Sequence, residues 1–206
     1  MASRELTTAE RRSLLGRLFV GGTEGNARLT ATIAAILVVL LAVEGATILS
    51  IGPLLPVHIF LGIFLVPLVG LKLASTGYRF LRYYAGALDY RALGPPQALM
   101  RFLVAPVVVA STTALFATGI ALVVVGPRRG ILLGLHKASF IVWLGALGVH
   151  VLLYALRAAR LVRADWLGEA TPGRTLRGAL LAGALVSGVV VALAMLPLAD
   201  RWTDVV

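Results

Sequence analysis

The sequence contains no cysteine and has little charge. Cysteine is absent from all 206 residues, which excludes disulfides, iron–sulfur clusters, cysteine-ligated zinc and covalently attached c-type haem. Charged residues make up 14% of the chain and hydrophobic residues 59%, whereas a soluble domain is usually about a quarter charged and about half apolar. The chain is therefore expected to be neither disordered nor a water-soluble globule.

The positive charge does not indicate a nucleic-acid partner. The formal net charge is +10, but it sits between long apolar runs rather than on a soluble basic surface. Five such runs are each about as long as the roughly 20 residues that a helix needs to cross a bilayer. They are Leu29–Ile51, Pro53–Thr76, Phe102–Val125, Ile131–Leu156 and Leu176–Leu198. The pattern predicts an all-α integral membrane protein, a bundle of five transmembrane helices over residues 29–198 in contact with membrane lipid.

The distribution of arginine predicts the orientation in the membrane. Fourteen arginines flank the expected spans on one side and three flank them on the other, while both lysines fall inside spans. Because cytoplasmic segments are enriched in positive residues, the N-terminus is expected inside and the C-terminus outside. Residues 1–28 would form a cytoplasmic tail with an amphipathic helix on the membrane surface, and residues 199–206 a short extracytoplasmic tail. The composition is typical of a GC-rich bacterial genome, so the bacterial cytoplasmic membrane is the expected location.

All three histidines fall inside expected spans, where ionisable side chains are costly and usually functional. His58 lies near the outer end of the second span, and His136 lies near the outer end of the fourth, which runs in the same direction. Two imidazoles at similar depth on parallel helices could be the axial ligands of one haem b between these spans. Gly62, on the same helix face as His58, would leave room for the porphyrin. Arg128 and Arg129 lie close to this level and could pair with the haem propionates.

A fourteen-residue step repeats on both of these spans. His150 follows His136 by fourteen residues, and Lys72 follows His58 by the same number. That step advances a helix by about 21 Å and returns to within about 40° of the same face. It predicts an inner level at which His150 and a neutral Lys72 could ligate the iron of a second haem. The alternative is that Lys72 stays charged and reaches the interface or a propionate. Further candidate propionate partners at the inner level are Tyr78, Arg79 and Arg82.

Three segments resemble the bacterial membrane-bound cytochrome b superfamily, which includes the haem subunits of respiratory oxidoreductases and ferric-reductase-like membrane domains. They are residues 57–62 (VHIFLG), 71–79 (LKLASTGYR) and 135–140 (LHKASF), the last followed by His150. The resemblance implies a helical bundle that binds haem b non-covalently and transfers electrons between the quinone pool and a redox partner protein. Where members with two haems carry a second histidine, this chain has Lys72.

Three classes of function follow from these features. The first is an electron-transfer subunit of an oxidoreductase system rather than a stand-alone enzyme, because the chain has neither room for a flavin or pterin domain nor a glycine-rich nucleotide loop. The second is a small proton-conducting or transporter-like protein without cofactor, in which ionisable side chains form a relay. Glu44 would then accept a proton or pair with Lys137; the alternative is that it simply reaches the outer interface. The third is a structural membrane subunit, in which the polar residues only fix helix packing.

Overall fold

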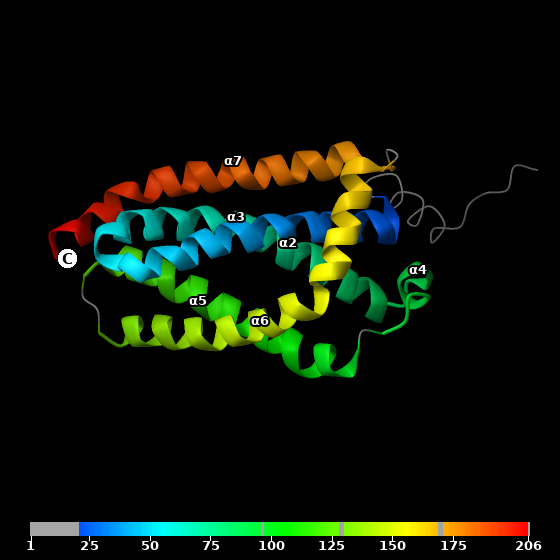
Figure 1. Ribbon diagram of the computed structural model, residues 1–206, viewed down its shortest axis with the longest axis horizontal. Helices are drawn as coiled ribbons and strands as arrows, with labels where there is room; N and C mark the ends of the chain where they lie inside the picture. The colour runs from blue at the N-terminus through cyan, green and yellow to red at the C-terminus, as the bar shows by residue number, and fades with distance from the viewer. Residues whose placement is uncertain (1–20, 96, 128–129, 169–170, 206) are drawn as a thin grey trace, which may run out of the picture.

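The computed structural model describes residues 21–95, 97–127, 130–168 and 171–205, and within these ranges every regular element is helical (Figure 1). The expected amphipathic helix of the N-terminal tail lies outside the described residues, as do Arg128 and Arg129. The long helices are α2 (Gly22–Thr47), α3 (Ile51–Tyr84), α5 (Ala105–Val125), α6 (Gly130–Leu167) and α7 (Arg174–Ala199). The shorter elements are η1 (Ile48–Ser50), α4 (Leu88–Arg91), the π-helical turn η2 (Met100–Val104) and η3 (Asp200–Val205).

Four helical stretches of the described chain are long and apolar enough to cross a membrane, as expected for a multi-pass membrane protein. They are Gly22–Tyr84, Met100–Val125, Gly130–Leu167 and Arg174–Trp202. The sequence predicted five spans, and the count differs because α2, η1 and α3 follow one another in a single run of 63 residues. Within that run Ser50 leaves the helical region with φ −140° and ψ 56°, and α3 returns alongside α2 (Figure 1).

The helices extend beyond the spans expected from hydropathy. The helix α2 begins at Gly22 rather than Leu29, α3 continues to Tyr84, and α6 continues to Leu167. Hydropathy marks only the apolar part of each helix. The flank of α6, residues 157–167, is rich in Arg, Ala and Leu, which have high helix propensity and extend the helical hydrogen bonding. Parts of the expected cytoplasmic segments are therefore continuous with the bundle.

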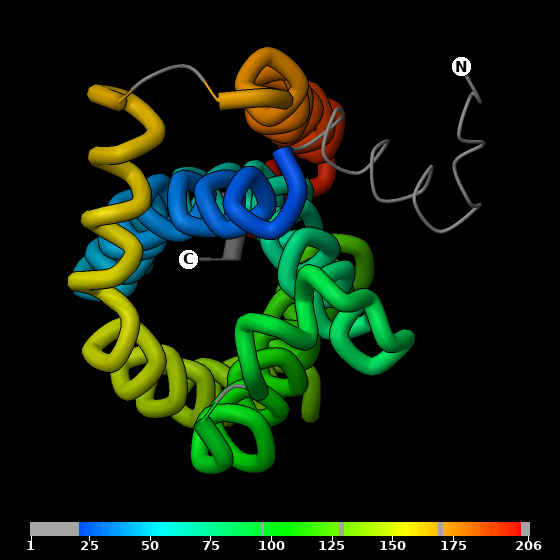
Figure 2. Tube along the Cα trace, turned by 90° about the vertical axis from the view of Figure 1, so that its right-hand side faces the viewer, coloured from blue at the N-terminus to red at the C-terminus, as the bar shows by residue number. Residues whose placement is uncertain are grey.

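Four helices surround the long axis of the molecule in the order α2, α3, α5, α6, and α7 packs on the outside against α3 (Figure 2). The helix α2 contacts α3 and α6, while α5 contacts α6 and, to a smaller extent, α3. Among the described residues, α3 and α6 make little or no direct backbone contact with each other. These two helices, which carry all three histidines, therefore lie across the diagonal of the four-helix ring.

Packing is tightest where α2, α3 and α7 meet. A cluster of buried side chains joins Leu29, Ile33 and Leu37 of α2 to residues of α3 and α7. A Cβ atom on Gly188 of α7 would lie 2.5 Å from the carbonyl oxygen of Phe64, so glycine permits close contact with α3 here. On α6, by contrast, Trp143 is the only residue of the described helix whose side chain is buried. The apolar core thus holds one side of the ring, and α6 closes the other side with little burial of its own.

The second half of α6 turns across one end of the bundle and approaches the start of α7 (Figures 1 and 2). This end also holds the first turn of α2 and the short helix α4. We call it the inner end, after the orientation expected from the sequence, and the end with η1 the outer end. The turn of α6 brings Ala164 and Asp165 over α2, where both contact Arg28.

Candidate functional site

His58 and His136 lie near the outer end of the bundle, close to the beginnings of α3 and α6. They are close enough for their rings to interact electrostatically, although their helices are diagonal partners in the ring. Each imidazole is hydrogen-bonded to a neighbouring helix: His58 to α2 and His136 to α5. The fold therefore brings together, at one end of the bundle, the two side chains that the sequence placed at one depth.

The hydrogen bonds of His136 determine where its proton lies. Its Nδ1 is 3.2 Å from the carbonyl oxygen of Leu115 and 3.1 Å from Oγ1 of Thr118. The Thr118 hydroxyl lies 2.7 Å from the carbonyl oxygen of Ala114, to which it donates, so its own oxygen is left to accept. Because a carbonyl oxygen accepts and cannot donate, Nδ1 carries the hydrogen in the neutral ring. The Nε2 atom then has a lone pair, and it makes no hydrogen bond within the described chain.

His58 has the same arrangement with different partners. Its Nδ1 lies 2.8 Å from Oγ1 of Thr47 and 3.0 Å from Oε1 of Glu44, both on α2. The Thr47 hydroxyl donates to the backbone carbonyl of Glu44, so with Glu44 ionised both oxygens accept from a hydrogen on Nδ1. The Nε2 atom of His58, like that of His136, makes no hydrogen bond among the described residues. The expected pairing of Glu44 with Lys137 is wrong, because α2 presents Glu44 to His58, while Lys137 is exposed on α6.

Two glycines lie beside the hydrogen-bonded side chains of His136 and Glu44. A Cβ atom on Gly119 of α5 would lie 3.2 Å from Cε1 of His136, closer than most real Cβ contacts, so glycine admits the imidazole here. A Cβ atom on Gly62 would lie 3.4 Å from Oε1 of Glu44. Gly62, expected to leave room for a porphyrin, therefore borders the carboxylate that holds His58. Sequence reasoning missed Gly119, because nothing in α5 reveals which of its faces meets His136.

The inner level has a different arrangement. Lys72 donates from Nζ to the carbonyl oxygen of Thr30 at 2.8 Å, and the hydroxyls of Thr30 and Ser75 are 3.0 Å apart. His150 is close enough to Lys72 for an electrostatic interaction. Its Nδ1 is buried and has no hydrogen-bond partner within the described residues. The expected inner pair is thus in one region, but neither member shows the hydrogen-bond pattern of the outer histidines.

Positive charge gathers near the inner pair. Arg79 of α3 interacts electrostatically with Lys72 and with Arg157 of α6, and in the described chain neither arginine has a carboxylate within 4.0 Å. Tyr78 packs edge-on against Tyr90, with ring centroids 6.1 Å apart. Burial raises the pKa of the Tyr90 hydroxyl, which keeps it neutral. Arg157 was missed in the sequence because it follows the expected end of its span at Leu156.

Comparisons with protein families, with curated proteins and with solved structures found no match to this chain. The described residues contain no group of three or more His, Cys, Asp or Glu side chains that could hold a metal ion by themselves. A haem brings four nitrogen ligands of its own and requires from the protein one or two axial ligands. The outer pair of imidazoles, each with an unpaired Nε2, therefore fits haem better than a bare metal ion.

Proposed function

We propose that the protein is a membrane-embedded b-type cytochrome that holds one haem b between α3 and α6. The Nε2 atoms of His58 and His136 would hold its iron. The observation that carries the proposal is that each Nδ1 is hydrogen-bonded to the neighbouring helix while each Nε2 has no partner in the described chain. Histidines that bind a metal almost always donate their other ring N–H to a carboxylate or a carbonyl, and this chain provides one of each.

The arrangement of the helices supports the same proposal. The two histidines come from helices on the diagonal of the ring, which make little or no direct backbone contact with each other in the described chain. When bound, the haem would supply reversible one-electron chemistry. The neighbouring helices hold both imidazoles through Nδ1, and Gly119 lets α5 approach the ring of His136. In keeping with the resemblance to the cytochrome b superfamily, we assign the protein to electron transfer between the quinone pool, or another donor, and a redox partner protein.

The proposal places one haem in each chain. At the inner level, Nζ of Lys72 is directed at α2, where it donates to the carbonyl oxygen of Thr30 at 2.8 Å. The Nδ1 of His150 has no acceptor in the described chain to fix its tautomer. We therefore assign Lys72 a charged, hydrogen-bonded role. Its proximity to Arg79 makes the inner end a positively charged region rather than a second pair of neutral ligands.

We further propose that α2 and α3 each cross the bilayer, which gives five crossings. The turn at Ser50 and the antiparallel course of the two helices support this count (Figure 1). With the N-terminus in the cytoplasm, as the arginine distribution predicts, the proposed haem lies toward the outer face of the bacterial cytoplasmic membrane.

The colour of the purified protein tests this function. The chain would be expressed in bacterial membranes with haem biosynthesis supported, purified in mild detergent and recorded as a reduced-minus-oxidised spectrum. The proposal predicts a Soret band and an α band of a low-spin b-type haem. A folded, helical and colourless protein would contradict it. Proton flux through vesicles containing that colourless protein would then support the cofactor-free relay instead.

A further inference from the structure

A pocket of about 180 Å³ opens at the inner end of the bundle, far from the outer histidines. Its lining comes from three helices: α2 contributes Leu29 and Thr32, α6 contributes Asp165 and Trp166, and α7 contributes residues between Arg174 and Leu181. In the described chain the ion pair of Asp165 with Arg177 links α6 to α7, and α2 packs beside both helices (Figure 2). The pocket is therefore an opening between two membrane helices, with a third helix as its floor.

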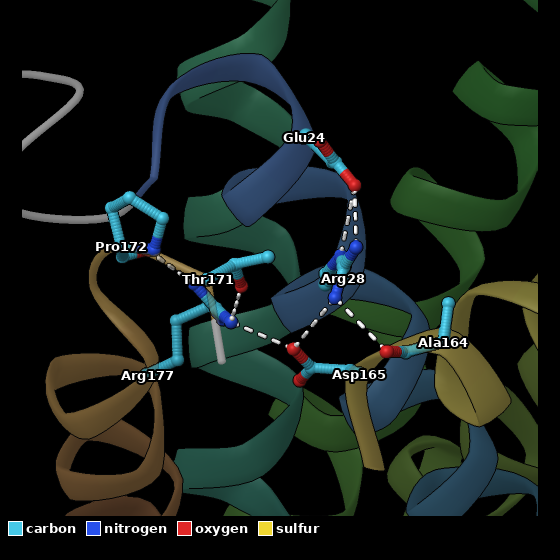
Figure 3. A network of polar contacts seen from close by, with 7 residues as sticks. All are labelled: Glu24, Arg28, Ala164, Asp165, Thr171, Pro172 and Arg177. Atoms are coloured by element: carbon cyan, nitrogen blue, oxygen red, sulfur yellow. Dashed lines mark hydrogen bonds and ion pairs between the residues drawn. The ribbon is translucent and has the colours of Figure 1, made fainter. Parts of the chain in front are cut away.

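Asp165 is the acidic group in the lining, and its charge is compensated. Its carboxylate lies 2.7 Å from the guanidinium of Arg177 and 3.7 Å from that of Arg28 (Figure 3). Arg28 also binds Glu24 and the carbonyl oxygen of Ala164. Since Asp165 and Arg177 are largely buried, this network holds the rim of the pocket in one geometry. It also prevents Asp165 from presenting an uncompensated negative charge to a ligand.

Arg174 adds a positive charge to the lining of the pocket. Among the described residues, Arg28 and Arg177 pair with the carboxylates Glu24 and Asp165, and Arg174 pairs with neither. Arg174 lines the pocket, is exposed, and its side chain makes no hydrogen bond or ion pair with other described residues. An available guanidinium at the rim is suited to a phosphate, which it can bind with two parallel hydrogen bonds.

The rest of the lining is apolar or nearly so. Leu29 and Leu181 line its walls, and Trp166, which is 63% exposed, lies at the end of α6. The side chain of Thr32 follows Leu29 by three residues, about 4.5 Å deeper along α2. Its hydroxyl is buried and has no hydrogen-bond partner in the described chain. At Gly178 a Cβ atom would meet nothing within 4 Å, so this part of the pocket is open.

We propose that this pocket binds an anionic phospholipid of the adjacent leaflet, with its phosphate on Arg174 and the start of its acyl chain against Leu29 and Leu181. A soluble phosphate would use the arginine but not the apolar walls, and a neutral quinone would use the walls but not the charge. An anionic lipid uses both, and basic pockets between membrane helices on the cytoplasmic side are typical of such head groups. The open position at Gly178 gives the chain a way out toward the surrounding lipid.

Lipid binding to the full-length, delipidated protein tests the proposal without reference to haem. Native mass spectrometry would follow titration with phosphatidylglycerol, with phosphatidylcholine, or with inorganic phosphate as competitor. Phosphatidylglycerol is expected to bind more tightly than phosphatidylcholine, and inorganic phosphate is not expected to displace it. Arg174→Gln should weaken phosphatidylglycerol binding roughly fivefold, since one basic group near the surface contributes about 1 kcal/mol.

Two further variants separate the pocket from general surface charge. Gly178→Leu fills the open part of the pocket without changing any charge, and it should reduce phosphatidylglycerol binding by a similar factor. Arg163→Gln removes an exposed arginine of α6 that does not line the pocket, and it should leave binding unchanged. Equal binding of both lipids, displacement by inorganic phosphate, or an equal loss in the Arg163 and Arg174 variants would overturn the proposal.

Discussion

The two imidazoles at the outer end are held by acceptors of unequal strength. His136 faces a backbone carbonyl and a hydroxyl, whereas His58 faces a hydroxyl and the carboxylate of Glu44. A carboxylate that accepts from Nδ1–H increases the electron density on Nε2 and makes the imidazole a more basic ligand. His58 is therefore expected to be the stronger of the two donors to iron.

Replacing Glu44→Gln should weaken haem binding and raise the reduction potential. The amide keeps the size of the side chain but removes a strong acceptor, so His58 donates less electron density and the ferric state loses stabilisation. Changes of such supporting groups typically cost about 10–100-fold in metal affinity. Haem retention and a spectroelectrochemical titration measure both effects. Glu24→Gln, the same change at a 64% exposed carboxylate of α2, serves as control. Unchanged affinity and potential in the Glu44 variant would show that this contact does not support a ligand.

The contribution of α5 depends on one glycine. Gly119 lies against the ring of His136, and the next residue toward the N-terminus, Thr118, bonds to its Nδ1. This part of α5 therefore supplies a hydrogen-bond partner and a close approach within two consecutive residues. Helix contacts in membranes commonly use small residues in this way, because they let neighbouring groups approach closely.

Gly119→Leu should displace the ring of His136 and reduce the haem content of the purified protein. The added Cβ alone would lie 3.2 Å from Cε1, and the larger side chain has no room beside the ring. Haem per protein, measured from the absorbance ratio of Soret band to protein, should fall well below that of the wild type. Gly183→Leu on α7 is the matched control, because a Cβ there meets nothing within 4 Å. If both variants retain full haem, α5 does not position a ligand.

At the scale of the whole molecule, Asp165 joins three helices at the inner end. It binds Arg28 of α2 and Arg177 of α7 from a position near the end of α6 (Figure 3). Asp165→Asn should leave two largely buried guanidiniums without a carboxylate between them. Breaking such a pair costs about 3–5 kcal/mol. The free energy of unfolding in mixed detergent micelles, measured in the absence of added lipid, checks this value. Glu24→Gln removes an exposed partner of Arg28 and should cost less than about 1 kcal/mol. Equal costs would contradict the account of the network.

The absence of cysteine makes the membrane topology directly testable. Leu49 is 88% exposed between α2 and α3, and Leu93 is 67% exposed after α4. Leu49→Cys should react with a membrane-impermeant maleimide from outside intact cells, and Leu93→Cys should react after the membrane is opened. This pattern requires that α3 crosses the bilayer. Labelling of both variants from the same side would exclude separate crossings by α2 and α3.

The sequence predicted the helical membrane fold because apolar runs of about 20 residues leave few other structures. It could not predict the partners of the histidines, because these depend on which helices become neighbours. Thr47, Thr118 and Gly119 have no distinctive local pattern, and they acquire a role when α2 and α5 pack beside α3 and α6. The helix ends were also missed, since hydropathy does not mark where hydrogen bonding continues into charged flanks.

The haem content of histidine variants tests the central claim most directly. Wild type, His58→Ala, His136→Ala and His150→Ala would be purified in the same way, and their haem would be counted as pyridine haemochrome per chain. The account predicts about one haem in the wild type and in the His150 variant, and loss of the low-spin spectrum in each of the other two while the protein still inserts. A full haem complement in both the His58 and His136 variants, or two haems in the wild type with one lost on replacing His150, would contradict it.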